Sequence, residues 1–206
     1  MNKIRFITVL AFTALLLSIL SQSIDDHSSL PTLKKDAVIL AFGDSITYGY
    51  GVDSTFSYPS QLEKKTGIHV INAGVSGEES SEGLLRLPEL LKKKPNLVIL
   101  CHGGNDILRK RSHVKLKNNL LEMIKLIKNS GADVLLVGVP NFGVFGFKIA
   151  KVYSEVADET GVAFEEDIVS VVESDRRFKS DNIHPNKKGY EMMADAFIKH
   201  LSIEEF

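Results

Sequence analysis

The sequence predicts an α/β protein in which a parallel β-sheet is covered by helices on both faces. Two observations support this prediction. Short, nearly continuous runs of Val, Ile and Leu alternate along the chain with longer stretches whose apolar residues recur every three or four positions. The runs are typical of strands buried on both faces, and the longer stretches are typical of helices with one buried face. Strands and helices in alternation form right-handed crossovers, which make the strands parallel.

Five apolar runs are the expected strands. They cover residues 37–42, 69–72, 97–101, 134–139 and, as the weakest of the five, 162–164. The third run ends in Cys101, which is the only cysteine of the chain, so an intrachain disulfide is excluded. Because Cys101 follows four apolar residues and has no cationic neighbours, we expect a buried strand residue and not a nucleophile.

Four amphipathic stretches are the expected main helices. The first follows Ser80 and Ser81, which can cap it, and contains Pro88, which we expect to kink the helix or break it locally. The other three have apolar faces within residues 116–127, 149–156 and 190–201. We interpret these faces as parts of the core.

The N-terminal segment is typical of a secretory signal. Lys3 and Arg5 precede an apolar stretch over residues 6–20, and small polar residues follow it. We therefore expect a signal peptide over residues 1–23, a linker over 24–35 and one folded domain over 36–206. An uncleaved membrane anchor is the alternative, although the stretch is shorter than the roughly 20 apolar residues of a spanning helix. The expected location is periplasmic or secreted, with membrane contact only through this segment.

The overall charge gives no reason to expect a nucleic-acid partner. Lys and Arg total 25, and Asp and Glu total 26, among 206 residues. Such a balance produces no global field that would attract a polyanion.

Polar segments follow three of the expected strands, and a fourth precedes the last helix. They are Gly43-Asp44-Ser45, Ala73-Gly74-Val75-Ser76-Gly77, Gly103-Gly104-Asn105-Asp106 and Asp181-Asn182-Ile183-His184-Pro185. The ligand crevice of an open parallel sheet lies beyond the carboxyl ends of its strands. Each segment alone reads as an ordinary turn or cap, but together they are expected to form one site at that edge.

The residue types in these segments are those that acyl transfer needs. Ser45 is the candidate nucleophile and His184 the base that takes its proton, while Asp181 can hold the other ring nitrogen of His184. The negative oxygen of a tetrahedral intermediate needs hydrogen-bond donors. Candidates for this oxyanion hole are the backbone N–H groups of Ser45 and Gly74 and the side-chain amide of Asn105.

The four segments resemble the four blocks of the GDSL, or SGNH, hydrolases, and the resemblance extends from residue 37 to the last helix. The bacterial exported group with thioesterase, arylesterase and lysophospholipase activities is the most similar, as residues 72–74, 85–88 and 183–186 indicate. The resemblance implies a flavodoxin-like α/β/α sandwich with a five-stranded parallel sheet and a Ser45-His184-Asp181 triad. It also implies that Ser45, Gly74 and Asn105 form the oxyanion hole, that no cofactor or metal takes part, and that the substrate is a small acyl ester or lipid.

Substrate contacts are harder to assign from the sequence. Asp44 adjoins the candidate nucleophile, and Phe142 and Phe145 lie in a stretch where glycines alternate with phenylalanines after the fourth expected strand. Such a loop can lie along an acyl chain, although its aromatic residues can equally cover the core.

Three other functions are alternatives to the hydrolysis of acyl esters. A carbohydrate acetyl esterase and a non-catalytic lipid- or glycan-binding module are both compatible with the same fold. A metal-dependent phosphoesterase would use oxygen and nitrogen donors such as Asp44, Asn72, Asn105, Asp106 and His184, but the chain lacks the further clustered ligands of a two-metal site.

Overall fold

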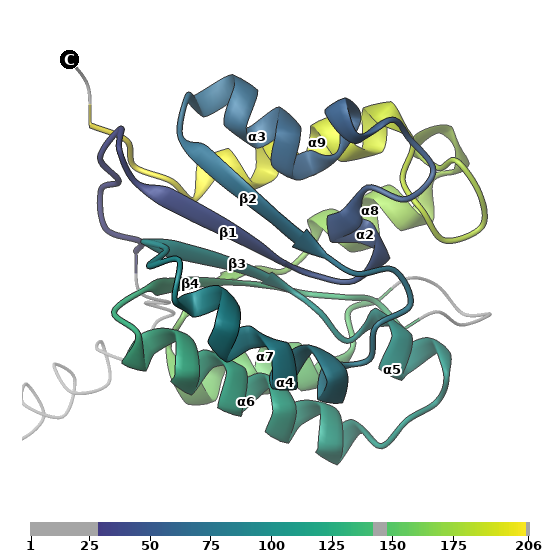
Figure 1. Cartoon of the computed structure of the whole chain (residues 1–206). Coiled ribbons are helices and arrows are strands. Elements are labelled where there is room, and N and C mark those ends of the chain that lie inside the picture. Colours follow the sequence, from purple (N-terminus) through teal and green to yellow (C-terminus); the bar gives the residue numbers. More distant parts are fainter. Residues whose placement is uncertain (1–28, 142–147, 205–206) are drawn as a thin grey trace, which may run out of the picture.

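A five-stranded parallel sheet forms the centre of the molecule (Figure 1). The computed structural model describes residues 29–141 and 148–204. The strands are β1 (Val38–Gly43), β2 (His69–Gly74), β3 (Leu97–Cys101), β4 (Asp133–Val137) and β5 (Ala163–Glu165), in the spatial order β2-β1-β3-β4-β5. Every neighbouring pair is parallel. This is the flavodoxin-like strand order, and it confirms the predicted fold class.

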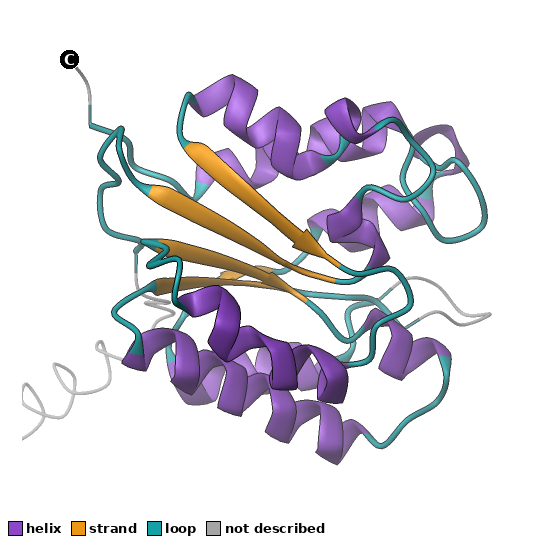
Figure 2. Ribbon diagram, in the orientation of Figure 1, coloured by secondary structure: helices purple, strands orange, loops and turns teal. Residues whose placement is uncertain are grey.

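Helices cover both faces of the sheet and complete a three-layer sandwich (Figure 2). One face is covered by α3 (Tyr58–Thr66), α8 (Ile168–Ser174) and α9 (Lys187–Lys199), and the other by α4 (Ser80–Leu91), α6 (His113–Asn129) and α7 (Lys151–Thr160). The short helices α2 (Ser45–Tyr48) and α5 (Gly104–Leu108) directly follow β1 and β3. Two 3-10 turns, η1 (Ser54–Phe56) and η2 (Arg176–Phe178), complete the elements of the described chain.

The continuous apolar runs are explained by this sandwich. In β1, Ile39 and Ala41 belong to the core beneath α3, α8 and α9, whereas Leu40 and Phe42 belong to the core beneath α4, α6 and α7. All four side chains are fully buried. Successive strand residues point to opposite faces, so a strand between two helical layers must be apolar at every position.

The start of α4 differs from the prediction. Glu79 is its N-cap and forms a capping box with Glu82, so neither of the two serines caps it. Ser80 is buried instead, and its hydroxyl and backbone N–H both donate to Asp106, at 2.6 and 2.8 Å. The helix also continues through Pro88 to Leu91 without the expected break.

The lead-in to β1 is attached to the end of the chain. Leu33 is buried, its N–H donates to the carbonyl oxygen of Ser202, and it forms a parallel bridge with Ile203. The last part of the predicted linker therefore packs on the domain. The predicted signal segment, residues 1–23, lies outside the described residues. Within the described ranges, we find no helix with the length and hydropathy needed to cross a membrane.

Candidate active site

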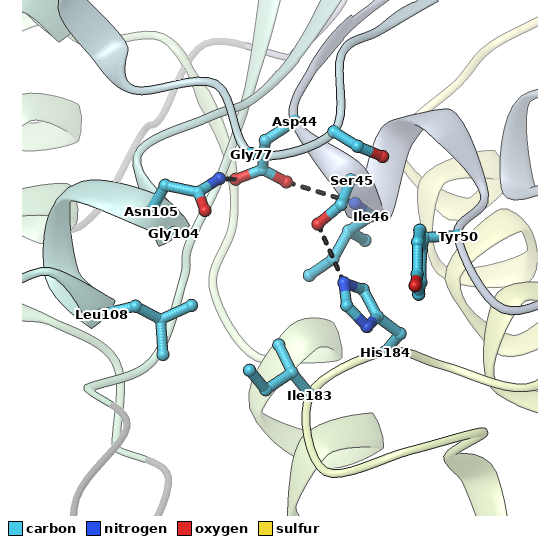
Figure 3. A pocket seen from close by; sticks show the side chains of 11 residues that line it. Asp44, Ser45, Ile46, Tyr50, Gly77, Gly104, Asn105, Leu108, Ile183 and His184 are labelled. Atoms are coloured by element: carbon cyan, nitrogen blue, oxygen red, sulfur yellow. Dashed lines mark hydrogen bonds between the residues drawn. The ribbon is translucent and has the colours of Figure 1, made fainter.

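A pocket of about 200 Å³ lies at the carboxyl edge of the sheet (Figure 3). Residues from the ends of β1, β2 and β3 and from the loop before α9 meet there. They are Asp44, Ser45, Ile46, Tyr50, Ser76, Gly77, Gly104, Asn105, Leu108, Ile183 and His184. The four segments singled out in the sequence therefore meet at one site.

Ser45, His184 and Asp181 form one chain of hydrogen bonds. The Ser45 hydroxyl lies 3.0 Å from Nε2 of His184, and the two groups face each other in the pocket (Figure 3). Nδ1 of His184 lies 2.8 Å from Oδ2 of Asp181. A carboxylate only accepts hydrogen bonds, so Nδ1 carries the proton in this arrangement. The lone pair of Nε2 is then free to accept the proton of the serine hydroxyl.

The local turn of the chain holds Asp181 in its ionised form. Oδ1 of Asp181 accepts hydrogen bonds from the backbone N–H groups of Ile183, at 2.7 Å, and of His184, at 2.8 Å. Burial alone would raise the pKa of Asp181, but these two bonds and the one from the His184 ring lower it to about 2. The carboxylate is therefore available to orient the ring at any pH above this value.

The turn that presents Ser45 depends on close packing. A Cβ atom on Gly43 would lie 2.1 Å from the carbonyl oxygen of Cys101, so only glycine fits between β1 and β3 at this point. Asp44 then caps α2 by accepting a hydrogen bond from the N–H of Ile46, at 3.2 Å. As a result, Ser45 is the first residue of α2, and its side chain lies in the pocket.

Asp44 forms the inner wall of the pocket. Its side chain is buried, and burial raises the pKa of its carboxyl group above the usual value. Oδ2 of Asp44 lies 3.4 Å from the side-chain amide of Asn105, which also donates to the carbonyl oxygen of Glu78, at 3.0 Å. The contacts of Asp44 are thus with the protein itself, and they hold Ser45 and Asn105 in place.

Gly74, which was predicted to be an oxyanion donor, is not among the residues that line this pocket. Its N–H donates to Oδ1 of Asn72, at 3.0 Å, and it lines a separate hollow beside Tyr48. A Cβ atom on Gly74 would lie 2.0 Å from the backbone nitrogen of Tyr48. The absence of a side chain therefore allows β2 to pack against α2, and it does not open a path for substrate.

Gly77, three residues after Gly74, is the glycine of this segment that lies at the pocket. It lines the pocket and has a φ of 81°, in the left-handed region that favours glycine. Among the hydrogen bonds of the described residues, none uses the backbone N–H of Gly77 or that of Ser45. Both groups are free to donate to a bound oxygen.

The remaining walls of the pocket are mostly apolar. The Tyr50 ring packs beside the His184 ring, with centroids 4.4 Å apart, and the Tyr50 carbonyl oxygen accepts a hydrogen bond from Tyr190. Leu108 and Ile183 line the side of the pocket below Asn105 and His184 in Figure 3. Tyr50 and Leu108 were not predicted from the sequence, although they lie close along the chain to the predicted site residues Ser45 and Asn105.

The other candidate residues have other positions. Phe142 and Phe145 lie outside the described residues. Cys101 is buried as predicted, and burial raises the pKa of its thiol. Among the described residues, no group of three or more His, Cys, Asp or Glu side chains is arranged to hold a metal ion.

Comparison with known proteins identifies the family. Residues 41–192 match the GDSL-like lipase/acylhydrolase family. An arylesterase of Vibrio mimicus is 32% identical over 178 residues, covering 79% of this chain and 89% of the relative. Esterase TesA of Pseudomonas aeruginosa is 35% identical over 161 residues, covering 71% and 79%. A crystal structure of TesA superposes with a TM-score of 0.72 at 31% identity, covering 79% of this chain and 97% of that one. The chain belongs to the GDSL-like lipase/acylhydrolase family and is an ester-hydrolysing enzyme.

Proposed function

We propose that the protein is a serine carboxylesterase that cleaves acyl esters and thioesters through an acyl-enzyme on Ser45. The observation that carries this proposal is the hydrogen-bonded chain from Asp181 through His184 to the Ser45 hydroxyl, which opens into a pocket. Esters and thioesters present the same carbonyl carbon to a serine oxygen, so one arrangement serves both.

The reaction follows from the protons in this chain. His184 Nε2 takes the proton of the Ser45 hydroxyl while Oγ bonds to the carbonyl carbon, whose oxygen becomes negative. The tetrahedral intermediate then expels the alcohol or thiol, which receives the proton from His184. Water attacks the acyl-enzyme by the same route, gives its proton to His184 and releases the carboxylic acid, and Ser45 recovers its proton. Asp181 orients the ring and stabilises its charged form throughout.

We assign the oxyanion hole to the backbone N–H groups of Ser45 and Gly77 and the side-chain amide of Asn105. All three residues line the pocket, and both backbone groups lack an acceptor among the described residues. One N–H of the Asn105 amide donates to the carbonyl oxygen of Glu78, and this bond orients the second N–H, which lies on the side of Asp44 Oδ2 at the long distance of 3.4 Å and is the donor that we assign to the oxyanion. Pre-oriented donors of this kind stabilise the developing charge without reorganising during the reaction.

The apolar walls indicate a carbon-rich acyl group. Tyr50, Leu108 and Ile183 offer hydrocarbon surface next to Ser45. A series of para-nitrophenyl esters with increasing acyl length tests this proposal, and we expect a maximum of kcat/KM at short to medium lengths. Hydrolysis of acetylated sugars without hydrolysis of any member of the series would favour the carbohydrate esterase instead. Failure to hydrolyse either class would favour the binding module.

We further propose that residues 1–23 direct export of the enzyme. The support is the order of a basic start, an apolar stretch and a small polar end in the sequence. N-terminal sequencing of the protein recovered outside the cytoplasm should begin at Ile24. Recovery of the intact chain from the membrane fraction would show that the segment is an anchor.

A further inference from the structure

Three charged or titratable side chains lie together next to the segment that contains Gly77. Glu78 and His102 are 7% and 0% exposed, and the Arg86 side chain is 26% exposed. Nε of Arg86 donates to Oε1 of Glu78, at 2.6 Å, and its Nη2 donates to Oε2, at 2.7 Å. Nε2 of His102 donates to the same Oε2, at 2.9 Å. The Glu78 carboxylate is therefore held from two sides.

Arg86 also joins the ends of two strands. Its Nη2 group contacts the carbonyl oxygens of Ala73, at 2.8 Å, and of Gly43, at 3.2 Å. Gly43 ends β1 two residues before Ser45, and Ala73 precedes the last residue of β2. The guanidinium group lies 4.3 Å from the centroid of the Phe42 ring, which supports it from one side. A planar guanidinium group binds both carboxylate oxygens of Glu78 through Nε and Nη2 while Nη2 also faces the strand ends, and a lysine ammonium group does not reproduce this bidentate geometry.

Glu78 connects this cluster to the proposed oxyanion donors. It directly follows Gly77 in the chain, and its own carbonyl oxygen accepts the hydrogen bond from the Asn105 amide. Movement of Glu78 would therefore move Gly77 and remove the 3.0 Å acceptor of the Asn105 amide, whereas the hydrogen bonds that join Ser45, His184 and Asp181 do not include Glu78.

Glu78 is ionised at a position that is mostly inaccessible to solvent. Burial acts to raise the pKa of Glu78, but the hydrogen bonds from His102 and Arg86 outweigh burial and lower the pKa below its usual value. The carboxylate is thus charged and mostly buried. Replacing such a buried ion pair with apolar residues is often neutral or stabilising, so a role in fixing geometry is the alternative to be tested.

We propose that Arg86, acting through Glu78, is a positioning residue for the oxyanion hole. Its guanidinium group fixes residues 73–78 against the turn before Ser45, so that the Gly77 N–H and the Asn105 amide converge on the same oxygen. This inference rests on the proposed function, because it needs Gly77 and Asn105 to be oxyanion donors.

A double-mutant cycle between Arg86→Ala and Asn105→Ala tests the inference. The cycle uses the full chain, with a para-nitrophenyl ester as substrate and active sites counted by titration with a phosphonate. We expect Asn105→Ala to lower kcat by roughly 100- to 1,000-fold, as the loss of one oxyanion donor does. Arg86→Ala should lower kcat by up to about 100-fold, as misplacement of a catalytic group does, with KM changed less than about threefold. In the double variant the two losses should overlap and fall well short of multiplying.

Two further variants separate positioning from folding. Guanidinium ion at concentrations well below denaturing ones should restore part of the kcat of Arg86→Ala but not of Asn105→Ala. Lys92→Ala removes an exposed cation from the end of the same helix and should leave kcat unchanged. If Arg86→Ala does not fold, Glu78→Gln takes its place in the cycle. Glutamine keeps the shape of the Glu78 side chain, but its hydrogen bonds to Arg86 and His102 are weaker because it has no charge.

The outcomes distinguish a failure of the positioning role of Arg86 from a failure of the assigned oxyanion hole. If Asn105→Ala loses activity as expected while Arg86→Ala stays within about threefold of the parent, or if the two losses multiply fully, the positioning role of Arg86 is wrong. If Asn105→Ala itself changes kcat by less than about threefold, the assigned oxyanion hole is wrong, and the role of Arg86 fails with it.

Discussion

The Ser45→Ala variant is expected to lose hydrolysis of every ester that the parent enzyme cleaves. Removal of the hydroxyl leaves His184 with no nucleophile to activate, although the pocket and the oxyanion donors persist. Losses of kcat for such a change reach roughly 10⁶-fold. The measurement is kcat for the best substrate of the para-nitrophenyl series, with the melting temperature checked to show that the variant is folded.

Substitutions of two other serines are compared with Ser45→Ala. Ser154→Ala changes a serine on α7 whose hydroxyl donates to the carbonyl oxygen of Lys151 in the same helix, and this variant should retain full activity. Ser76 lines the same pocket as Ser45. Retention of activity by Ser45→Ala, combined with its loss in Ser76→Ala, would move the nucleophile to Ser76 and overturn the mechanism.

The Asp181→Asn variant is expected to lower kcat/KM by roughly 100- to 10,000-fold. An amide in place of the carboxylate no longer selects the tautomer with the proton on Nδ1 of His184, and it no longer stabilises the charged ring. The backbone bonds from Ile183 and His184 can still be accepted by the remaining oxygen, so we expect the loop to keep its shape. Asp158→Asn, an exposed change on α7, is the matched control.

The pH dependence follows from the lowered pKa of Asp181. A carboxyl group whose pKa is lower in the folded protein stabilises the fold above its unfolded value, near 3.8, and this stabilisation is lost as the pH falls toward about 2. Asp181 therefore stays ionised across the range in which activity is measured. A loss of less than tenfold in Asp181→Asn would show that Asp181 does not orient the base.

The sheet was predictable because its strands are buried on both faces. Apolar residues such as Ile39 and Leu40 must then occur in unbroken runs, and each run ends where the crevice begins. Even β5, with three residues, was detected from Val162 to Phe164. The meeting of Ser45 with His184, 139 residues later, follows from the same topology, because both segments lie at one edge of the sheet.

The sequence does not decide between neighbouring residues when the choice depends on the direction of the backbone. Gly74 and Gly77 occur in one segment, and the sequence does not show that the N–H of Gly74 faces Asn72. The N-cap of α4 is a second case. Serine is a better capping residue than glutamate, but the Ser80 hydroxyl donates to Asp106, 26 residues away, and Glu79 is the cap.

The Arg86 cluster was missed for a different reason. Its members are separated along the chain, and the resemblance of residues 85–88 to the exported esterase group assigns Arg86 no role. Only the packing of α4 against the ends of β1 and β2 brings the guanidinium group of Arg86 to the carbonyls of Gly43 and Ala73. A contact of this kind leaves no local pattern in the sequence.

Covalent labelling with an alkyl fluorophosphonate, read by mass spectrometry of the intact and digested protein, tests the central claim most directly. The reagent reacts with an activated serine and mimics the tetrahedral intermediate. We predict that one phosphonyl group is added per chain, that it is found on Ser45, and that activity is lost in proportion to labelling, with no addition to Ser45→Ala. Full activity in the presence of excess reagent, or stoichiometric labelling at a different residue, would contradict the assignment of Ser45 as the nucleophile.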